Sequence, residues 1–129
     1  MSKFKLDTNQ GIIFCRVEIS KKQQSVFLKM ALDTGATYTM VPPEAVMSIG
    51  IDPSRSKRKI EVTTGSGIIF VPIITIPRFR AFGFEIKNLE VICHNLPPES
   101  AVEGLLGLNF IKHFNVLLKF LQHTLEVNN

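Results

Sequence analysis

The sequence predicts an all-β fold with one or two short helices. Apolar and polar side chains alternate over residues 13–19 and 26–32, the period of two that marks a strand with one buried face. The longest apolar run, residues 68–77, is interrupted by Pro72 and Thr75 and has the length of a buried strand, too short to span a bilayer. Helical spacing is confined to two short segments, residues 42–50 and 108–114.

Length and composition predict a single domain over residues 1–129. The chain is 45% hydrophobic and 20% charged, and a chain of this length buries a substantial core. The first five residues carry no apolar signal region, so we expect a cytoplasmic protein with no membrane segment.

Each predicted element has local support. Residues 13–19 and 26–32 form a hairpin across a polar turn, residues 20–25. Pro43 suits the first turn of a helix and Gly50 its end. A second hairpin joins residues 60–62 to 68–76 through a small tip, residues 63–67. The apolar phase changes in residues 84–93, which predicts a bulge or turn near Lys87 and Asn88.

The acid at the end of the second strand is the strongest functional signal. Asp33 is followed by Thr34, Gly35 and Ala36 and is flanked by apolar stretches. A carboxylate next to a buried strand needs pairing, or has its pKa shifted to where it can transfer protons. Taken alone, however, Asp-Thr-Gly is also an ordinary turn between strands.

A second element far downstream makes the signal more specific. Gly104, Leu105 and Leu106 lead into Gly107, and a helical pattern follows with Phe110 and Phe114 four residues apart. The chain therefore contains one strand ending at Asp-Thr-Gly and another ending at glycine before a helix.

Together these elements resemble the retropepsin-like aspartic proteases, the single-lobe family related to retroviral proteases. The resemblance covers residues 11–127. It implies a closed or partly open β-barrel of the acid-protease type, an endopeptidase activity and no metal or cofactor. The family's elements correspond to an N-terminal hairpin, an active-site loop, a flap hairpin, a strand with a short helix, and a C-terminal strand, here residues 11–32, 33–36, 61–76, 105–114 and 115–127.

The number of acids predicts a homodimer. Aspartic protease chemistry needs two carboxylates close enough to share one proton. The chain has three aspartates, and neither Asp7 nor Asp52 lies in a second Asp-Thr-Gly. Each chain of a twofold dimer would therefore contribute one Asp33 as the catalytic residue, acting on a peptide or protein substrate through an activated water, and a mildly acidic pH optimum is expected.

The resemblance also implies roles for other residues. Thr34 would hold the two loops together across the dimer axis, Gly35 would allow close approach, and Ala36 would line the wall. The substrate-binding flap tip would consist of Thr64, Gly65, Ser66 and Gly67. The structural supports of the Asp33 loop would be Gly107 and Asn109.

Two features depart from the family pattern. The flap tip is polar, and Pro72 lies in the return strand, where it cannot donate to a sheet. An alternative function is therefore a non-catalytic dimerisation or peptide-binding module with the same fold. The aromatic insertion at residues 77–84 extends the binding surface or, more commonly for such residues, packs in the core.

Other chemistries have weaker support. Cys15 and Cys93 fall in apolar strand patterns and are expected to be reduced and buried. A Cys-His nucleophile has no local motif, and no paired spacing of zinc ligands occurs. The net charge is +4, and residues 55–59 form a basic run, but no aromatic side chains interleave it as nucleic-acid binding would favour. We expect this run to be a solvated loop and no nucleic-acid partner.

Overall fold

The computed structural model describes residues 2–129, and most of them lie in strands. The short helices are α1 and α2, with one 3-10 turn, η1. The elements in chain order are β1 (Ser2–Lys5), β2 (Phe14–Lys21), β3 (Gln24–Leu32), β4 (Met40–Val41), α1 (Pro43–Ser48), η1 (Pro53–Arg55), β5 (Lys59–Thr64), β6 (Gly67–Ala81), β7 (Phe84–Cys93), β8 (Gly104–Leu106), α2 (Leu108–Ile111), β9 (Asn115–Lys119) and β10 (Thr124–Asn128).

Six strands close into a barrel. Their order is β2-β3-β8-β4-β7-β6, and β6 pairs back with β2 to complete the ring. This closing ladder is antiparallel and runs from Val17 opposite Ala81 to Ser20 opposite Arg78. The predicted all-β barrel with two short helices is therefore confirmed. Within residues 2–129, no helix is long and apolar enough to cross a membrane.

The first hairpin is longer than its sequence pattern indicated. β2 and β3 stay paired up to Lys21 opposite Gln24, so the turn contains two residues where six were expected. Lys22 adopts a positive φ of 55° at this turn, as the tight turns that match the twist of a hairpin require. Polar residues thus extend both strands, because backbone groups form the hydrogen bonds of a sheet regardless of which side chains the residues carry.

β6 changes partners along its length. Its first part pairs with β5, ending at Lys59 opposite Pro72, and its second part pairs with β7 from Ile73 opposite Ile92. The Ile73 amide donates to the Arg58 carbonyl; neighbouring amides of a strand point to opposite edges, so the nitrogen of Pro72 faces the β7 side. Proline has no hydrogen to donate there, and pairing with β7 starts only after it.

The bulge or turn predicted near Lys87 and Asn88 does not interrupt β7, which is one strand from Phe84 to Cys93. The β6–β7 register continues without an inserted residue from Ile76 opposite Leu89 to Arg78 opposite Lys87. The change of phase instead occurs at Asn88, whose φ is 55°. Asparagine tolerates this left-handed conformation, and the residue opposite it is Pro77, which has no amide hydrogen to pair. The side-chain phase is thereby switched without lengthening the strand.

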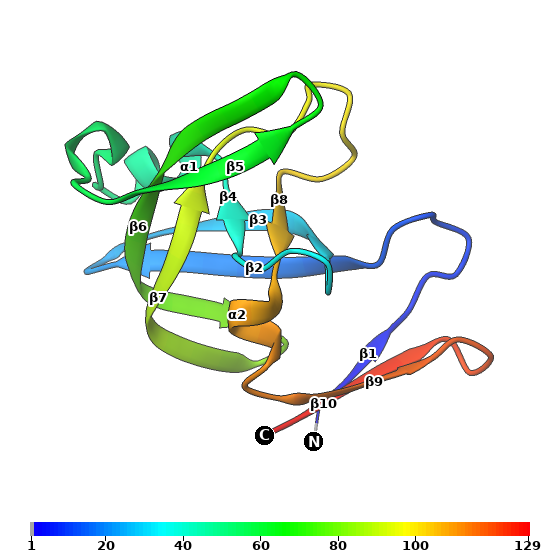
Figure 1. The fold of residues 1–129 in the computed structure, drawn as a ribbon. Coiled ribbons are helices and arrows are strands. Elements are labelled where there is room, and N and C mark those ends of the chain that lie inside the picture. Colours follow the sequence, from blue (N-terminus) through cyan, green and yellow to red (C-terminus); the bar gives the residue numbers. More distant parts are fainter. Residues whose placement is uncertain (1) are drawn as a thin grey trace.

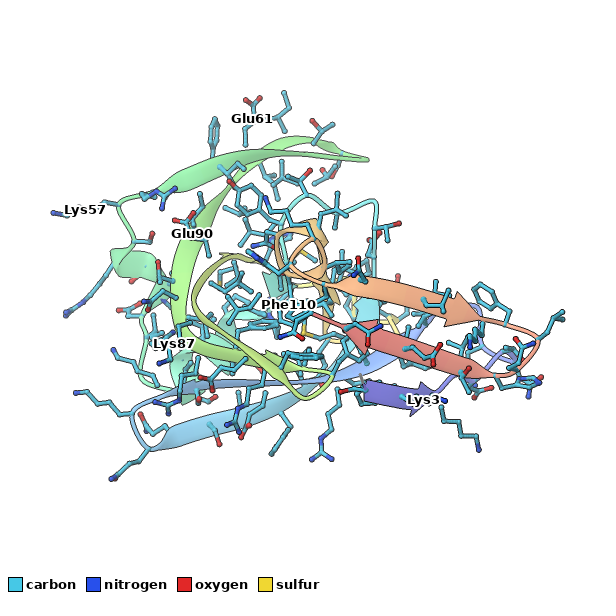
Figure 2. The ribbon with its side chains drawn as sticks, turned by 90° about the horizontal axis from the view of Figure 1, so that it is seen from below. Lys3, Lys57, Glu61, Lys87, Glu90 and Phe110 are labelled. Atoms are coloured by element: carbon cyan, nitrogen blue, oxygen red, sulfur yellow. The ribbon has the colours of Figure 1, made fainter. Side chains whose placement is uncertain are left out.

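Aromatic rings fill the barrel interior around α2. Phe110 is almost fully buried and points into the middle of the molecule (Figure 2). Its ring centroid lies 5.4 Å from that of Phe79 and 5.1 Å from that of Phe114, which contacts Phe84. The helix itself ends at Ile111, so Phe114 lies beyond it. The two rings predicted to share a helix face, Phe110 and Phe114, are nevertheless in contact. The insertion at residues 77–84 therefore packs mainly as core.

A second, three-stranded sheet joins the two ends of the chain, with the order β1-β10-β9. Figure 1 shows it at the opposite end of the molecule from the β5–β6 hairpin. The sequence did not predict β1, which has only four residues, and the expectation of one strand over residues 115–127 was wrong. A turn splits that segment, and His123 has a φ of 55° there, which reverses the chain into a hairpin.

Glu126 is the buried charge of this terminal sheet. Its carboxylate lies 3.0 Å from the Lys119 ammonium and 3.7 Å from that of Lys3, and its residue is only 5% exposed. The hydrogen bond from Lys119, with the charges of both lysines, holds the pKa of Glu126 below its ordinary value. The ion pairs thus contribute stability above the ordinary glutamate pKa, and this stability is lost as pH falls through the lowered pKa.

Glu126→Gln is therefore expected to lower the melting temperature at neutral pH and to make little difference in strong acid, where the wild-type carboxyl is protonated. Thermal unfolding of both proteins over a pH series measures this. Glu99→Gln, in an exposed loop, is the matched control and should give a curve parallel to wild type. A constant difference between Glu126→Gln and wild type at all pH values would contradict the ion-pair account.

Candidate active site

Asp33 lies where a central barrel strand ends. β3 runs parallel to β8, with Leu32 opposite Leu106, and the Asp33 amide donates to the Leu106 carbonyl over 2.9 Å. Strand pairing therefore fixes the backbone up to the acid and leaves the following loop at the barrel edge. Asp33 is half-buried, whereas Thr34 and Gly35 are exposed.

The loop orients the Asp33 carboxyl by its own backbone. The Gly35 amide donates to Asp33 Oδ1 over 2.9 Å, and the Ala36 amide donates to the Asp33 carbonyl over 3.2 Å. A Cβ built on Gly35 would lie 3.2 Å from Oδ1, tighter than an ordinary contact. Glycine at this position thus lets the loop fold closely around the carboxyl.

A hydrogen-bond network joins the Asp33 loop to α2. The Gly107 amide donates to Thr39 Oγ1 over 3.1 Å, and the Thr39 hydroxyl donates to Asn109 Oδ1 over 2.8 Å. The Thr39 amide donates to the same oxygen, also over 2.8 Å, and the Leu108 amide donates to the Ala36 carbonyl. Thr39 is fully buried. Gly107 and Asn109 therefore link α2 to the segment that follows Asp33. The sequence did not predict a role for Thr39, because its place between Tyr38 and Met40 gives no distinct signal.

Asn109→Ala is expected to destabilise the protein by about 1–3 kcal/mol, because it leaves the buried amide and hydroxyl of Thr39 without their acceptor. Urea unfolding measures the loss. Asn9→Ala, the same change in an exposed loop, should alter the free energy of unfolding by less than about 0.5 kcal/mol. Equal stability of the two variants would show that the network does not support the loop.

The flap is here defined as residues 59–72 of the β5–β6 hairpin, and it rises above the barrel (Figure 1). Its strands are longer than predicted and its tip is shorter, because Thr64 pairs with Gly67 and its hydroxyl donates to the Gly67 carbonyl. Gly65 and Ser66 alone form the turn, and both are exposed. Gly67 has a φ of 128°, a conformation that glycine adopts most readily.

Two hollows flank the Asp33 loop. One, of about 360 Å³, lies between the loop and the flap, and the other, of about 440 Å³, includes Asp33 itself. Both are lined mainly by apolar side chains. Residues that sequence reasoning did not assign to the site line them, notably Tyr38, Met40, Ile60 and Val62 in the first and Leu96 and Val102 in the second. The alternation of Ile60 and Val62 was a usable signal, since it places both on one face of the flap.

The other aspartates lie away from Asp33 and bond locally. Asp52 accepts hydrogen bonds from the amide and hydroxyl of Ser54 at the start of η1, and these bonds hold its pKa below the ordinary value. Asp7 accepts from the Asn9 amide in an exposed loop. Neither is a partner for Asp33, so Asp33 is the one aspartate of residues 2–129 that lies at this site. The other acid that lines the hollows is Glu61 of the flap.

The two thiols are buried and chemically quiet. Burial raises the pKa of Cys15 to about 12 and that of Cys93 to about 11, so both are protonated thiols at neutral pH. Within residues 2–129, no group of three or more histidine, cysteine or acidic side chains is arranged to hold a metal ion.

Sequence comparison gives the family. The model of the family described as "gag-polyprotein putative aspartyl protease" matches residues 16–113, a span that includes the Asp33 loop, the flap and α2. The chain belongs to this family. No curated protein sequence matches this aspartyl protease family member.

Structural comparison gives the fold of this aspartyl protease family member. The chain is similar to the crystal structure of a retropepsin-like aspartic protease from Rickettsia conorii, with a TM-score of 0.73 and 20% sequence identity. The match covers 98% of this chain and 88% of the other. The fold is thus the retropepsin fold, as the sequence predicted.

Proposed function

We infer that the protein is an aspartic endopeptidase that works as a homodimer. The observation that carries this proposal is the Asp33 loop, which holds one carboxyl at the barrel edge between two apolar hollows. The family match makes a peptidase the natural reading of such a loop. Asp33 is the proposed catalytic residue, with Thr34, Gly35 and Ala36 as its loop.

The second acid comes from a second copy of the chain. The described chain offers no partner for Asp33, while Thr34 and Gly35 are exposed beside it. A twofold axis through this surface brings two identical loops together, as an isologous interface requires. Thr34 then takes the position from which its hydroxyl bonds the opposite loop.

The paired carboxylates share one proton, because two like charges at such a distance do not both ionise. The ionised member accepts a proton from a water whose oxygen bonds to the peptide carbonyl carbon. The protonated member donates its proton to the carbonyl oxygen. The resulting tetrahedral diol collapses when the C–N bond breaks: the amine nitrogen takes the proton that the first carboxylate received from water, and a diol hydroxyl returns its proton to the second carboxylate as the carboxylic acid product forms. The pair again holds one proton, and no covalent bond to the enzyme forms.

The substrate is proposed to be an extended peptide held between the loop and the flap. Apolar side chains of the peptide fit the two hollows, and the tip formed by Thr64, Gly65, Ser66 and Gly67 closes over its backbone. The tip is short and polar, so it contributes hydrogen bonds more than apolar cover.

A peptide library tests the proposal. The purified protein is incubated with a diverse peptide pool from acidic to neutral pH, and mass spectrometry identifies the products. The expected result is internal cleavage, fastest at mildly acidic pH, with a specific activity that falls when the protein is diluted because active dimers dissociate. An activity that is independent of concentration, in a protein shown to be monomeric, would contradict the shared site.

The polar flap tip favours one alternative, a dimerisation or peptide-binding module without catalysis. Such a module would bind peptides from the same pool and leave them intact. A folded, dimeric wild-type protein that binds peptides and cleaves none would decide for this alternative.

A further inference from the structure

The outer face of the β2–β3 hairpin carries two opposed cations that no acid neutralises. Arg16 and Lys29 are directly opposite each other in the antiparallel pair, and both are exposed. Like charges in directly opposed positions destabilise a sheet. Within residues 2–129, no acidic oxygen lies within 4.0 Å of either charge. By contrast, Arg80 of the neighbouring strand β6 is paired with Glu18 and Glu85.

Two phenyl rings hold these cations. The Arg16 guanidinium carbon lies 4.1 Å from the centre of the Phe27 ring, and the Lys29 nitrogen lies 4.1 Å from the centre of the Phe14 ring. Cation–π contact at this distance is favourable and fixes both long side chains over the sheet. The donors of the guanidinium and the ammonium remain available to a ligand.

The cations and rings border an open hollow of about 330 Å³ on this face. Phe27 is 52% exposed, so apolar surface remains beside the charges. Strand neighbours point the opposite way, because Cys15 and Leu28 belong to the core. In Figure 2 the β2–β3 hairpin lies along one edge of the molecule.

The nearby acids are already engaged. Glu18 is bound by Arg80 over 3.5 Å, and Glu103 Oε1 accepts the backbone amide of Lys29 over 2.9 Å. Neither carboxylate forms an ion pair with Arg16 or Lys29.

We propose that this cation–aromatic face, defined as Phe14, Arg16, Phe27 and Lys29, is a docking surface for an acidic peptide segment of a partner protein. Two carboxylates of the segment bind Arg16 and Lys29, and an apolar side chain between them packs on the part of Phe27 that the Arg16 guanidinium leaves exposed. Charge complementarity favours this partner. Nucleic acid is disfavoured because each ring already has a cation over it, in the position where a base would stack. β2 pairs with β6 from Val17 to Ser20, and β3 pairs with β8 from Met30 to Leu32. The backbone of Lys29 bonds to Glu103, and the recognition proposed here uses side chains.

Fluorescence anisotropy tests the proposal with a labelled ten-residue peptide of alternating glutamate and leucine, and with its glutamine-for-glutamate counterpart. Mass spectrometry establishes that the peptide stays intact during the measurement. The double variant Arg16→Gln, Lys29→Gln is compared with Arg55→Gln, Lys57→Gln, which removes the same charge from the exposed basic segment before the flap. Figure 2 shows Lys57 extending away from the barrel.

The wild-type protein is expected to bind the acidic peptide. The Arg16→Gln, Lys29→Gln variant should bind it about tenfold more weakly, since two exposed ion pairs contribute about threefold each. The control double variant should change the affinity by less than about twofold. The glutamine peptide should bind no better than background. Phe27→Ala should weaken binding of the glutamate–leucine peptide and leave binding of a glutamate–serine peptide unchanged.

Three outcomes would overturn the proposal: no binding by wild type, equal weakening by both double variants, or tighter binding of a single-stranded oligothymidine that Arg16→Gln, Lys29→Gln abolishes. If that variant does not fold, amide chemical shifts of the wild-type protein decide during peptide titration. Amide shifts must change at residues 14–18 and 26–30 and stay unchanged at residues 55–57.

Discussion

Asp33→Asn is expected to abolish peptide cleavage by the proposed dimer, with a loss of at least about a thousandfold. Asparagine is close to aspartate in shape, and its side-chain oxygen still accepts the Gly35 amide hydrogen bond that orients residue 33. It cannot carry the proton that the two acids exchange with water and peptide. Mutation of one position removes both members of the pair, since each copy contributes the same residue.

The control is Asp7→Asn, the same chemical change in an exposed loop, which should retain wild-type cleavage. Circular dichroism and size-exclusion chromatography establish that both variants fold and associate as wild type does. Mixing wild type with an excess of Asp33→Asn should also lower the rate, because mixed dimers contain one acid. Full activity of Asp33→Asn would refute the assignment of Asp33.

Gly107→Ala is expected to destabilise the protein by about 3 kcal/mol, the upper part of the usual range for overpacking. A Cβ at this position would lie 2.7 Å from the carbonyl carbon and oxygen of Tyr38 and 2.8 Å from the carbonyl oxygen of Ala36. These are backbone atoms, which cannot rotate away as a side chain does. The loop that follows Asp33 would have to move, so activity should fall together with stability.

Gly11→Ala is the matched control for stability, because a Cβ there meets nothing within 4 Å. Chemical unfolding monitored by circular dichroism compares the free energies of unfolding of the two variants with wild type. A difference between Gly107→Ala and Gly11→Ala below about 0.5 kcal/mol would show that the loop accommodates the methyl group.

The sequence predicted those parts of the fold that local patterns encode. Alternation located β2 and β3, and the segment before Gly107 located β8 and α2. Local patterns failed where long-range pairing decides the structure. β1 has four residues and two lysines, and only pairing with β10 makes it a strand. Asn88 was read as a bulge because the sequence shows the change of phase and not the backbone angle that produces it.

The site was predictable to the same degree. Asp33 and Gly107 are marked by their motifs, while the lining of the hollows depends on which faces the barrel brings together. Tyr38 and Met40 follow the Asp33 loop closely, yet Ile60 and Val62 reach it only through the folding of the flap. The cation–aromatic face was invisible because its rings and charges alternate on two strands and meet only across the pair.

Pro72 has an energetic consequence for motion. Above it the flap is a two-stranded ribbon, and such ribbons have little stability of their own. Because β7 pairing begins at Ile73, lifting the flap breaks no hydrogen bond of the β6–β7 ladder. It costs mainly the side-chain contacts of Ile60, Val62 and the buried Val71 beneath it. Because Pro72 lacks an amide hydrogen, the flap can thus open while the barrel strands β6 and β7 stay paired.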